Sequence, residues 1–332
     1  MSERKAWVGR ITGPPDETLE AALRWLEWER IVPPDARVAI KPNLTYPFYK
    51  PGVTTSPAVL DALVRIMARR THHIAIVESD GGSYSWPAQK AFEGHGIDTI
   101  CARYGARAVN LTESPREWAE TEISGRPIRL EMSRLLLRET DVFITVPVPK
   151  VHVMTRVSLG FKNQWGCLPD VKRLRHHADF ARKVLAVNKL LRPALAIFDG
   201  TYFLNRTGPM EGDAVKMDLL IASNDAGAGS LACCALMRID PRSVPHLRLA
   251  MKEGMMPAEV SQMTLNSPLE RFIGPEFYLR RSLMHWLTLG IFHSTLATRI
   301  AYDSRAAKPL HDIVYALRGR PKDFAPRWGK DG

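Results

Sequence analysis

Two lysines in the chain directly follow apolar runs of strand length. Lys41, with Asn43 two residues later, ends the stretch "VAIKPN" (38–43), and Lys150, with His152 two residues later, follows "DVFITVPV" (141–148). Turn preferences do not explain these lysines, because turns favour Gly, Pro, Asn, Asp and Ser. An ammonium group fixed in such a place can bind a carboxylate or phosphate, and with a lowered pKa it can act as a base or form a Schiff base. We therefore expect Lys41 and Asn43 to bind a substrate, and Lys150 and His152 to take part in catalysis.

The stretch from 146 to 180 holds the densest group of such residues, including Lys162, Asn163 and His176. Lysines and a histidine that lie close together lower one another's pKa values and favour an anion between them. A histidine at the start of a helix can also donate to an anion beside free backbone N–H groups. These three residues are predicted to bind substrate. The alternative is a solvated loop with ordinary surface charge.

Two carboxylates also follow apolar runs, Asp80 in "ESDGG" and Asp199 in "FDG". Placed near an imidazole, such groups exchange protons with a substrate, and we expect both to be catalytic. The alternative is that Asp and Gly stand there only because the chain turns.

Familiar cofactor motifs are not satisfied. The spacing of His152, His176 and His177 matches no compact zinc motif, so no metal site is predicted. The stretch "NDAGAGS" (224–230) departs from the dinucleotide fingerprint at its third glycine, and a Walker loop is missing. Four cysteines without a C-x-x-C pair are expected to be buried thiols. The sequence names no cofactor.

The elements that must position these residues alternate between strand and helix patterns. Apolar runs at 37–40, 73–77, 141–148, 194–198 and 218–223 are continuous, which is typical of strands covered on both faces. Helical patterns lie between them, as at 16–30, where the first turn is acidic, and at 57–70, with Ser56 as cap and Pro57 at the first position. We predict an α/β fold with a mostly parallel sheet and helices on both faces over 1–245, followed by a helical, basic C-terminal extension over 246–332.

Parallel strands would gather the polar residues into one place. Ligands bind in the crevice at the carboxyl ends of such strands. If all five runs are parallel, Lys41, Lys150 and Asp199 converge there, as do Asn224 and Asp225. The loop "TGPMEGDA" (207–214) is expected to cover the same edge.

Composition narrows the class of protein and its location. A hydrophobic content of 45% and a charged content of 24% are those of a soluble globular protein. The charged N-terminus carries no apolar signal core, which predicts a cytoplasmic protein. The net charge is +11, but residues 277–330 hold ten Lys or Arg against three Asp or Glu, so the excess belongs to the tail and nucleic acid is not an expected partner.

The uncharged stretch 282–298 is bracketed by Arg280, Arg281 and Arg299. It is shorter than the about 20 apolar residues that a membrane span needs. A buried helix is one interpretation. A peripheral membrane contact through residues 277–330, helped by Trp286, is the other.

The order of motifs resembles the domain-of-unknown-function 362 family over about residues 38–240. The likeness rests on "KPNL", "PGVTTSP", "ESDGGS", "VPKVHVMTRVSLGFKNQWG", "LAIFDG" and "NDAGAG" in this order. The resemblance implies functional positions at Lys41, Asn43, Asp80, Lys150, His152, Lys162, Asn163 and Asp199. Many members of the family look like iron–sulfur proteins with an appended cysteine cassette, which this chain lacks. It also has Ala226 and Ser230 where members usually have proline and a second aspartate.

Two kinds of function fit these observations. The first is a cytoplasmic enzyme that binds an anionic small molecule, a carboxylate or phosphate, at the strand ends. The second is a redox-partner, maturation or accessory protein, which the resemblance to iron–sulfur proteins suggests. The sequence identifies neither the reaction nor the oligomeric state.

Overall fold

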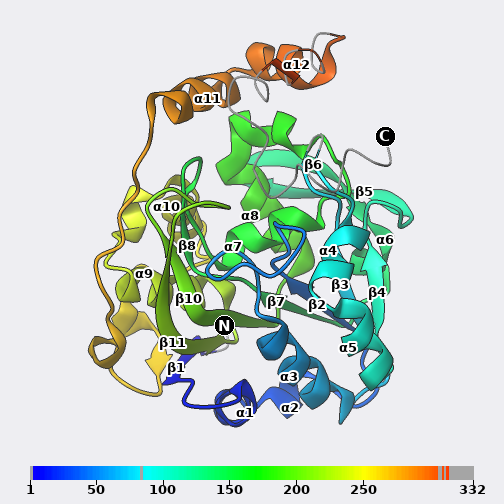
Figure 1. Ribbon diagram of the computed structural model, residues 1–332, viewed down its shortest axis with the longest axis vertical. Helices are drawn as coiled ribbons and strands as arrows, with labels where there is room; N and C mark the ends of the chain where they lie inside the picture. Colours follow the sequence, from blue (N-terminus) through cyan, green and yellow to red (C-terminus); the bar gives the residue numbers. More distant parts are fainter. Residues whose placement is uncertain (1–2, 83–84, 306–308, 310–311, 314–332) are drawn as a thin grey trace.

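The computed structural model describes residues 3–82, 85–305, 309 and 312–313. In this part of the chain, ten strands form one large sheet with helices on both faces, which confirms the predicted α/β fold (Figure 1). The strands are β1 (Lys5–Arg10), β2 (Val38–Pro42), β3 (Ile74–Glu78), β4 (Arg107–Asn110), β7 (Val142–Val146), β8 (Lys150–His152), β9 (Arg156–Ser158), β10 (Leu195–Asn205), β11 (Asp213–Ser223) and β12 (Thr264–Leu265).

The centre of the sheet is parallel. Its order is β12-β1-β11-β10-β7-β2-β3-β4, and β10, β7, β2, β3 and β4 all run the same way. Strand β11 runs antiparallel to β10 and to β1. The expectation of five parallel runs is therefore wrong for 218–223, because a hairpin rather than a crossover helix joins this strand to β10.

The α-helices of the described residues are between four and twelve residues long. They are α1 (Pro15–Trp25), α2 (Trp28–Ile31), α3 (Pro57–Ala68), α4 (Ala88–Gly94), α5 (Ile97–Tyr104), α6 (Arg134–Arg138), α7 (Gly160–Asn163), α8 (Phe180–Leu191), α9 (Ala226–Leu236), α10 (Pro245–Lys252), α11 (Leu283–His293) and α12 (Thr295–Asp303). Helix α3 has Ser56 at its cap and Pro57 at its first position, as predicted. The expected helix at 16–30 is divided into α1 and α2, because Glu27 between them has a left-handed backbone (φ 54°).

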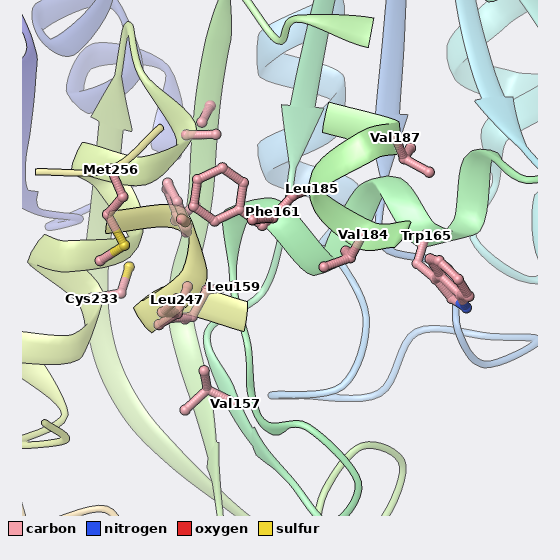
Figure 2. Close-up of a cluster of buried hydrophobic side chains, with 14 of the residues drawn as sticks. Val157, Leu159, Phe161, Trp165, Val184, Leu185, Val187, Cys233, Leu247 and Met256 are labelled. Atoms are coloured by element: carbon pink, nitrogen blue, oxygen red, sulfur yellow. The ribbon is translucent and has the colours of Figure 1, made fainter. Parts of the chain in front are cut away.

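Each face of the sheet supports its own hydrophobic core, because successive strand residues point to opposite faces. Ile40 and Ile76 pack with Leu19 and Leu63 on the face covered by α1 and α3. On the other face, neighbouring strand residues pack with α8 and α9, and Figure 2 shows part of this cluster, including Val184 of α8. All five residues of β2 and of β3 are buried, as their continuous apolar sequence predicts.

Strands β10 and β11 extend beyond the rest of the sheet as a long hairpin. The predicted strand 194–198 continues to Asn205, with a register irregularity between Gly200 and Tyr202. The pair Asp199–Gly200 therefore lies within a strand, not in the turn expected from its sequence. The loop 206–212 closes this hairpin.

Seven strands were not anticipated from the sequence, and three of them, β8, β9 and β12, are only two or three residues long. Strand β1 is short and alternates in burial, and β4 is a partly exposed edge strand. Strands β5 (Arg116–Ile123) and β6 (Arg126–Ser133) form a separate antiparallel pair. These segments are rich in charge, so they lack the continuous apolar runs that identify the central strands.

The chain after residue 245 contacts the sheet before it reaches α11. Strand β12 pairs with β1, and Arg206 at the end of the hairpin bonds to residues 278 and 280 through their backbones. Helices α11 and α12 lie at one end of the molecule (Figure 1) and pack on the 3-10 helix η2 (Arg173–Asp179). None of the described helices is long and apolar enough to cross a membrane. The division at 245/246 stays a prediction.

Candidate functional site

The carboxyl ends of the parallel strands β2 and β3 lie at one edge of the sheet, as predicted, and the short strand β8 joins them there. A cavity of about 350 Å³ lies there. Six of the nine predicted site residues line it: Lys41, Asn43, Lys150, His152, Lys162 and Asn163. Pro209 and Met210 from the hairpin loop also line it, as expected for the 207–214 loop.

The segment 53–56, which precedes α3, holds these strand ends together. The carbonyl oxygen of Val53 accepts a hydrogen bond from Lys150 Nζ (2.5 Å). Thr55 Oγ1 accepts from the backbone N–H of Asn43 (2.8 Å) and donates to the carbonyl of Val146 (2.8 Å). The N–H of Ser56 donates to Asp199 (2.6 Å). One short segment thereby fixes the ends of β2, β7 and β8 and the middle of β10.

Lys41 forms a buried ion pair with Glu78 from the neighbouring strand. Its Nζ lies 2.7 Å from Glu78 Oε2 and 2.7 Å from the carbonyl oxygen of Pro42. The Asn163 amide donates to the Lys41 carbonyl (2.9 Å) and to Thr145 Oγ1 (2.9 Å). The charge of Lys41 is thus largely compensated within the protein. Asn163 fixes the backbone at the end of β2.

Lys150 and His152 lie two residues apart on β8, so both side chains point to the same face. Burial lowers the pKa of Lys150 well below its usual value, and the positive charges of Lys162 and Lys41 lower it further. Burial and the neighbouring lysines also lower the pKa of His152. His152 is therefore neutral at pH 7, and Lys150 loses its proton more readily than an exposed lysine does. His152 Nδ1 accepts from the N–H of Met154 (3.1 Å), which leaves the ring proton on Nε2.

Three donors in the cavity wall have no acceptor among the described residues. Lys162 Nζ forms no hydrogen bond or ion pair there and lies 6.0 Å from the Phe180 ring. Arg173 donates through one Nη to the Asp80 carbonyl (2.8 Å), but its buried Nη1 has no partner. The buried Nε1 of Trp165 also lacks one, and Figure 2 shows it on the side of the ring away from the other labelled side chains. Burial and the charge of Arg173 lower the pKa of Lys162 to about 7.

The other three predicted residues do not line this cavity. Asp80 accepts from the Ala88 N–H (2.8 Å) and from Asn110 (2.9 Å) and so fixes the loop after β3. Asp199 accepts from Ser56 and twice from Thr201, at 3.1 and 2.7 Å, while burial raises its pKa. His176 lies 3.3 Å from Asp170 and 2.9 Å from Lys183.

The sequence-based selection missed several cavity residues, among them Glu78, Trp165, Arg173 and His177. Glu78 is a charged residue at the end of the buried strand β3. A charged residue after an apolar run was also the signal that identified Lys41 on β2. Arg173 and His177 belong to the basic stretch around the predicted His176, but a one-residue shift on a 3-10 helix turns the side chain by about 120°. His177, not His176, therefore points into the cavity.

Asn224 and Asp225 lie at the opposite edge, because β11 is antiparallel. Asn224 accepts from the N–H of Lys5 (2.8 Å), and Asp225 caps α9 by accepting from the N–H of Ala228 (2.7 Å). Asp225 also pairs with Arg4 (3.1 Å). These residues have structural partners away from the cavity.

The cysteines are buried and form no disulfide, as expected of structural thiols. Burial raises the pKa of Cys167 and of Cys234 to about 12. Among the described residues, His, Cys, Asp and Glu form no group of three or more that could hold a metal ion.

The chain is similar over part of its length to several known proteins. The thylakoid-associated protein of Synechocystis sp. (strain PCC 6803) is 29% identical over 126 residues, which are 36% of this chain and 39% of that protein. A Thermotoga maritima protein of known structure is 16% identical, with a TM-score of 0.43 over 69% of this chain and 60% of that one. The lactate racemase apoprotein of Thermoanaerobacterium thermosaccharolyticum is 14% identical, with a TM-score of 0.47 over 72% and 58%. This chain spans less than two thirds of the length of each.

The family match covers the part of the chain that builds the cavity. Residues 38–235 match the family described as "Domain of unknown function (DUF362)". The match begins at β2 and ends in α9, so it contains β2, β3 and β8, which carry cavity residues. The chain belongs to the DUF362 family.

Proposed function

We propose that the cavity at the strand ends binds an anionic small molecule through a carboxylate or phosphate group. The observation that carries this proposal is the set of donors on Lys162, Arg173 and Trp165 that lack an acceptor among the described residues. Buried donors normally have partners, and an unsatisfied one costs about 1–3 kcal/mol. In this proposal the oxygens of the anion accept from these donors. Glu78 lines the cavity as well, but its charge is paired with Lys41.

The two polar side chains of β8 suggest an enzyme acting on that anion. The Nε2–H of His152 is suited to donate to a ligand oxygen, and Lys150, whose lowered pKa favours the neutral amine, is suited to accept a proton or attack a carbonyl. In this proposal Lys41, Asn43 and Asn163 shape the binding site. Asp80 and Asp199 act indirectly as positioning residues, since they fix the loops that carry cavity residues.

Phosphate binding to the whole protein tests the proposal. Inorganic phosphate, titrated calorimetrically, should bind the native protein, and Lys162→Met should lose about 1.5–3 kcal/mol of binding free energy, roughly ten- to a hundredfold in Kd. Because the pKa of Lys162 is lowered to about 7, phosphate affinity of the native protein should fall as the pH rises above 7. The part of this decrease in phosphate affinity that is due to deprotonation of Lys162 should be absent in Lys162→Met.

Lys172→Met is the matched control, because Lys172 is exposed and does not line the cavity. It should bind phosphate as the native protein does. Equal affinity of Lys162→Met and Lys172→Met, or no binding of phosphate and acetate by the native protein, would refute the anion site.

The accessory or redox-partner role is the alternative. It predicts visible absorption and bound metal in protein purified without oxygen. The enzyme proposal predicts instead that Lys150→Met abolishes turnover while phosphate still binds. Retained activity in that variant would remove the proposed role of Lys150.

We further propose that this protein is cytoplasmic and contacts a membrane peripherally through residues 277–330. Several of these residues lie outside the described part of the chain. In α11 and α12, Leu283, Trp286 and Leu296 are 78%, 57% and 69% exposed. The similarity to a thylakoid-associated protein agrees with this proposal. Sedimentation with anionic vesicles tests it, and protein that stays in solution at low salt contradicts it.

A further inference from the structure

A second cavity adjoins the cationic one. It has a volume of about 430 Å³ and lies between α8, α10 and α11. Met154 and His177 line both cavities, so the two share a wall. Both volumes fall within the about 300–1,000 Å³ that is usual for ligand pockets.

The second cavity is largely apolar. Phe180, Leu289 and Phe292 line it, and Leu289 and Phe292 are only 8% and 4% exposed. The imidazoles of His177 and His246 belong to the wall, but burial and the charge of Lys162 lower both pKa values to about 3. At neutral pH these rings are therefore uncharged.

The charged residues of this cavity are held by other parts of the protein. Arg281 donates to the carbonyl of Val153 (2.7 Å), and Arg156 donates to that of Ser243 (2.8 Å). Asp179 pairs with Arg182 at 2.7 Å. The bond from Arg281 also fixes the start of α11 next to Met154, where the two cavities meet.

We propose that the ligand is amphiphilic, with its anionic group in the cationic cavity and an apolar chain in the cavity beneath α11. This inference rests on the proposed anion site and adds the class of ligand. A small acid without a chain would leave the apolar cavity unused. A chain of carbon atoms passing Met154 and His177 would bury its surface against Phe180, Leu289 and Phe292.

A series of n-alkyl phosphates, from ethyl to octyl and below micelle-forming concentrations, tests the proposal by calorimetry with the full chain. Each added methylene should tighten binding by up to about fourfold while the chain lies within the second cavity. Leu289→Gln should remove most of this gain, because it introduces an amide into the apolar wall. Its affinity for inorganic phosphate should stay that of the native protein, which also shows that the variant is folded.

Ile291→Gln is the matched control, since Ile291 lies on the same helix, is 41% exposed and does not line the cavity. It should retain the full gain with chain length. Equal affinity for ethyl and octyl phosphate, or an unchanged gain in Leu289→Gln, would overturn the inference and leave the anion site standing. A gain with chain length together with an unchanged affinity of Lys162→Met for every alkyl phosphate would instead overturn the anion site.

Phosphatidylcholine vesicles containing phosphatidic acid distinguish the two sources of such a ligand. If these vesicles displace octyl phosphate, the ligand is taken from a lipid surface. If they do not, although octyl phosphate binds with the expected gain, the ligand is a soluble amphiphilic acid.

Discussion

Removing the negative charge from the buried ion pair should destabilise the fold severely. The side chains of Lys41 and Glu78 are 2% and 8% exposed. Glu78 Oε2 accepts from Lys41 and from the N–H of Leu44 (3.2 Å), and Oε1 accepts from the N–H of Ser79 (3.1 Å). Glu78→Gln leaves the ammonium of Lys41 buried without a negative charge beside it, because the remaining amide oxygen is a neutral acceptor. We expect a loss of about 3–5 kcal/mol in the free energy of unfolding.

The size of this loss follows from the contacts. A hydrogen bond to a charged group contributes about 1.5–3 kcal/mol, and the substitution removes at least one of the three bonds that the carboxylate accepts, because one of its oxygens becomes an NH2 donor that faces another donor. The rest is the cost of keeping an uncompensated charge out of water. In the double variant Lys41→Met with Glu78→Gln that charge is gone, so about half or more of the stability should return.

Urea unfolding of the four proteins, native, two single variants and the double variant, measures the coupling. The exposed pair of Arg37 and Asp141, at 2.6 Å, is the control, because breaking it should cost about 1 kcal/mol or less. If Glu78→Gln costs no more than that control, or if the double variant loses the sum of the two single losses, the reasoning about the buried charge is wrong.

Three further measurements check other parts of the site. Stability should fall as the pH drops from 6.5 towards 3, because buried histidines with lowered pKa bind protons only on unfolding, and His246→Phe should make that fall shallower in urea titrations. Gly166→Ala should lower the unfolding free energy by about 1–3 kcal/mol, since its Cβ would lie 2.8 Å from Glu78 Oε1 and 3.0 Å from Lys41 Nζ. Asp199→Ala should cost more than Asp199→Asn in thermal unfolding, since the amide oxygen still accepts from Ser56 and alanine leaves that N–H unsatisfied.

The central strands and their common edge were predictable from the sequence, because buried parallel strands consist of continuous apolar runs. Lys41 and Lys150 stood out for the same reason, as charges directly after such runs. The direction of β11 was not predictable in this way, since an apolar run looks the same in either direction. The hairpin that reverses the chain direction includes residues 199–205, in which apolar and polar residues alternate less clearly.

The hydrogen-bond partners of the side chains could not be predicted from the sequence either. Asp80 and Asp199 have the residue type of a catalytic acid, yet their hydrogen bonds go to backbone and side-chain groups of their own loops. Conversely, Trp165 and Arg173 look like ordinary core and surface residues, and only the structure places their unsatisfied donors in the cavity wall.

The long arm formed by the hairpin of β10 and β11 determines how far the loop at its end reaches over the cavity. Two-residue steps lengthen or shorten an antiparallel arm without changing which side chains face inward near the sheet. Pro209 and Met210 stand at its tip and touch the site, whereas Phe198 and Ile221 at its base belong to the core. A longer or shorter arm would therefore change the volume of the cavity beside its tip, while the residues at the strand ends keep their positions.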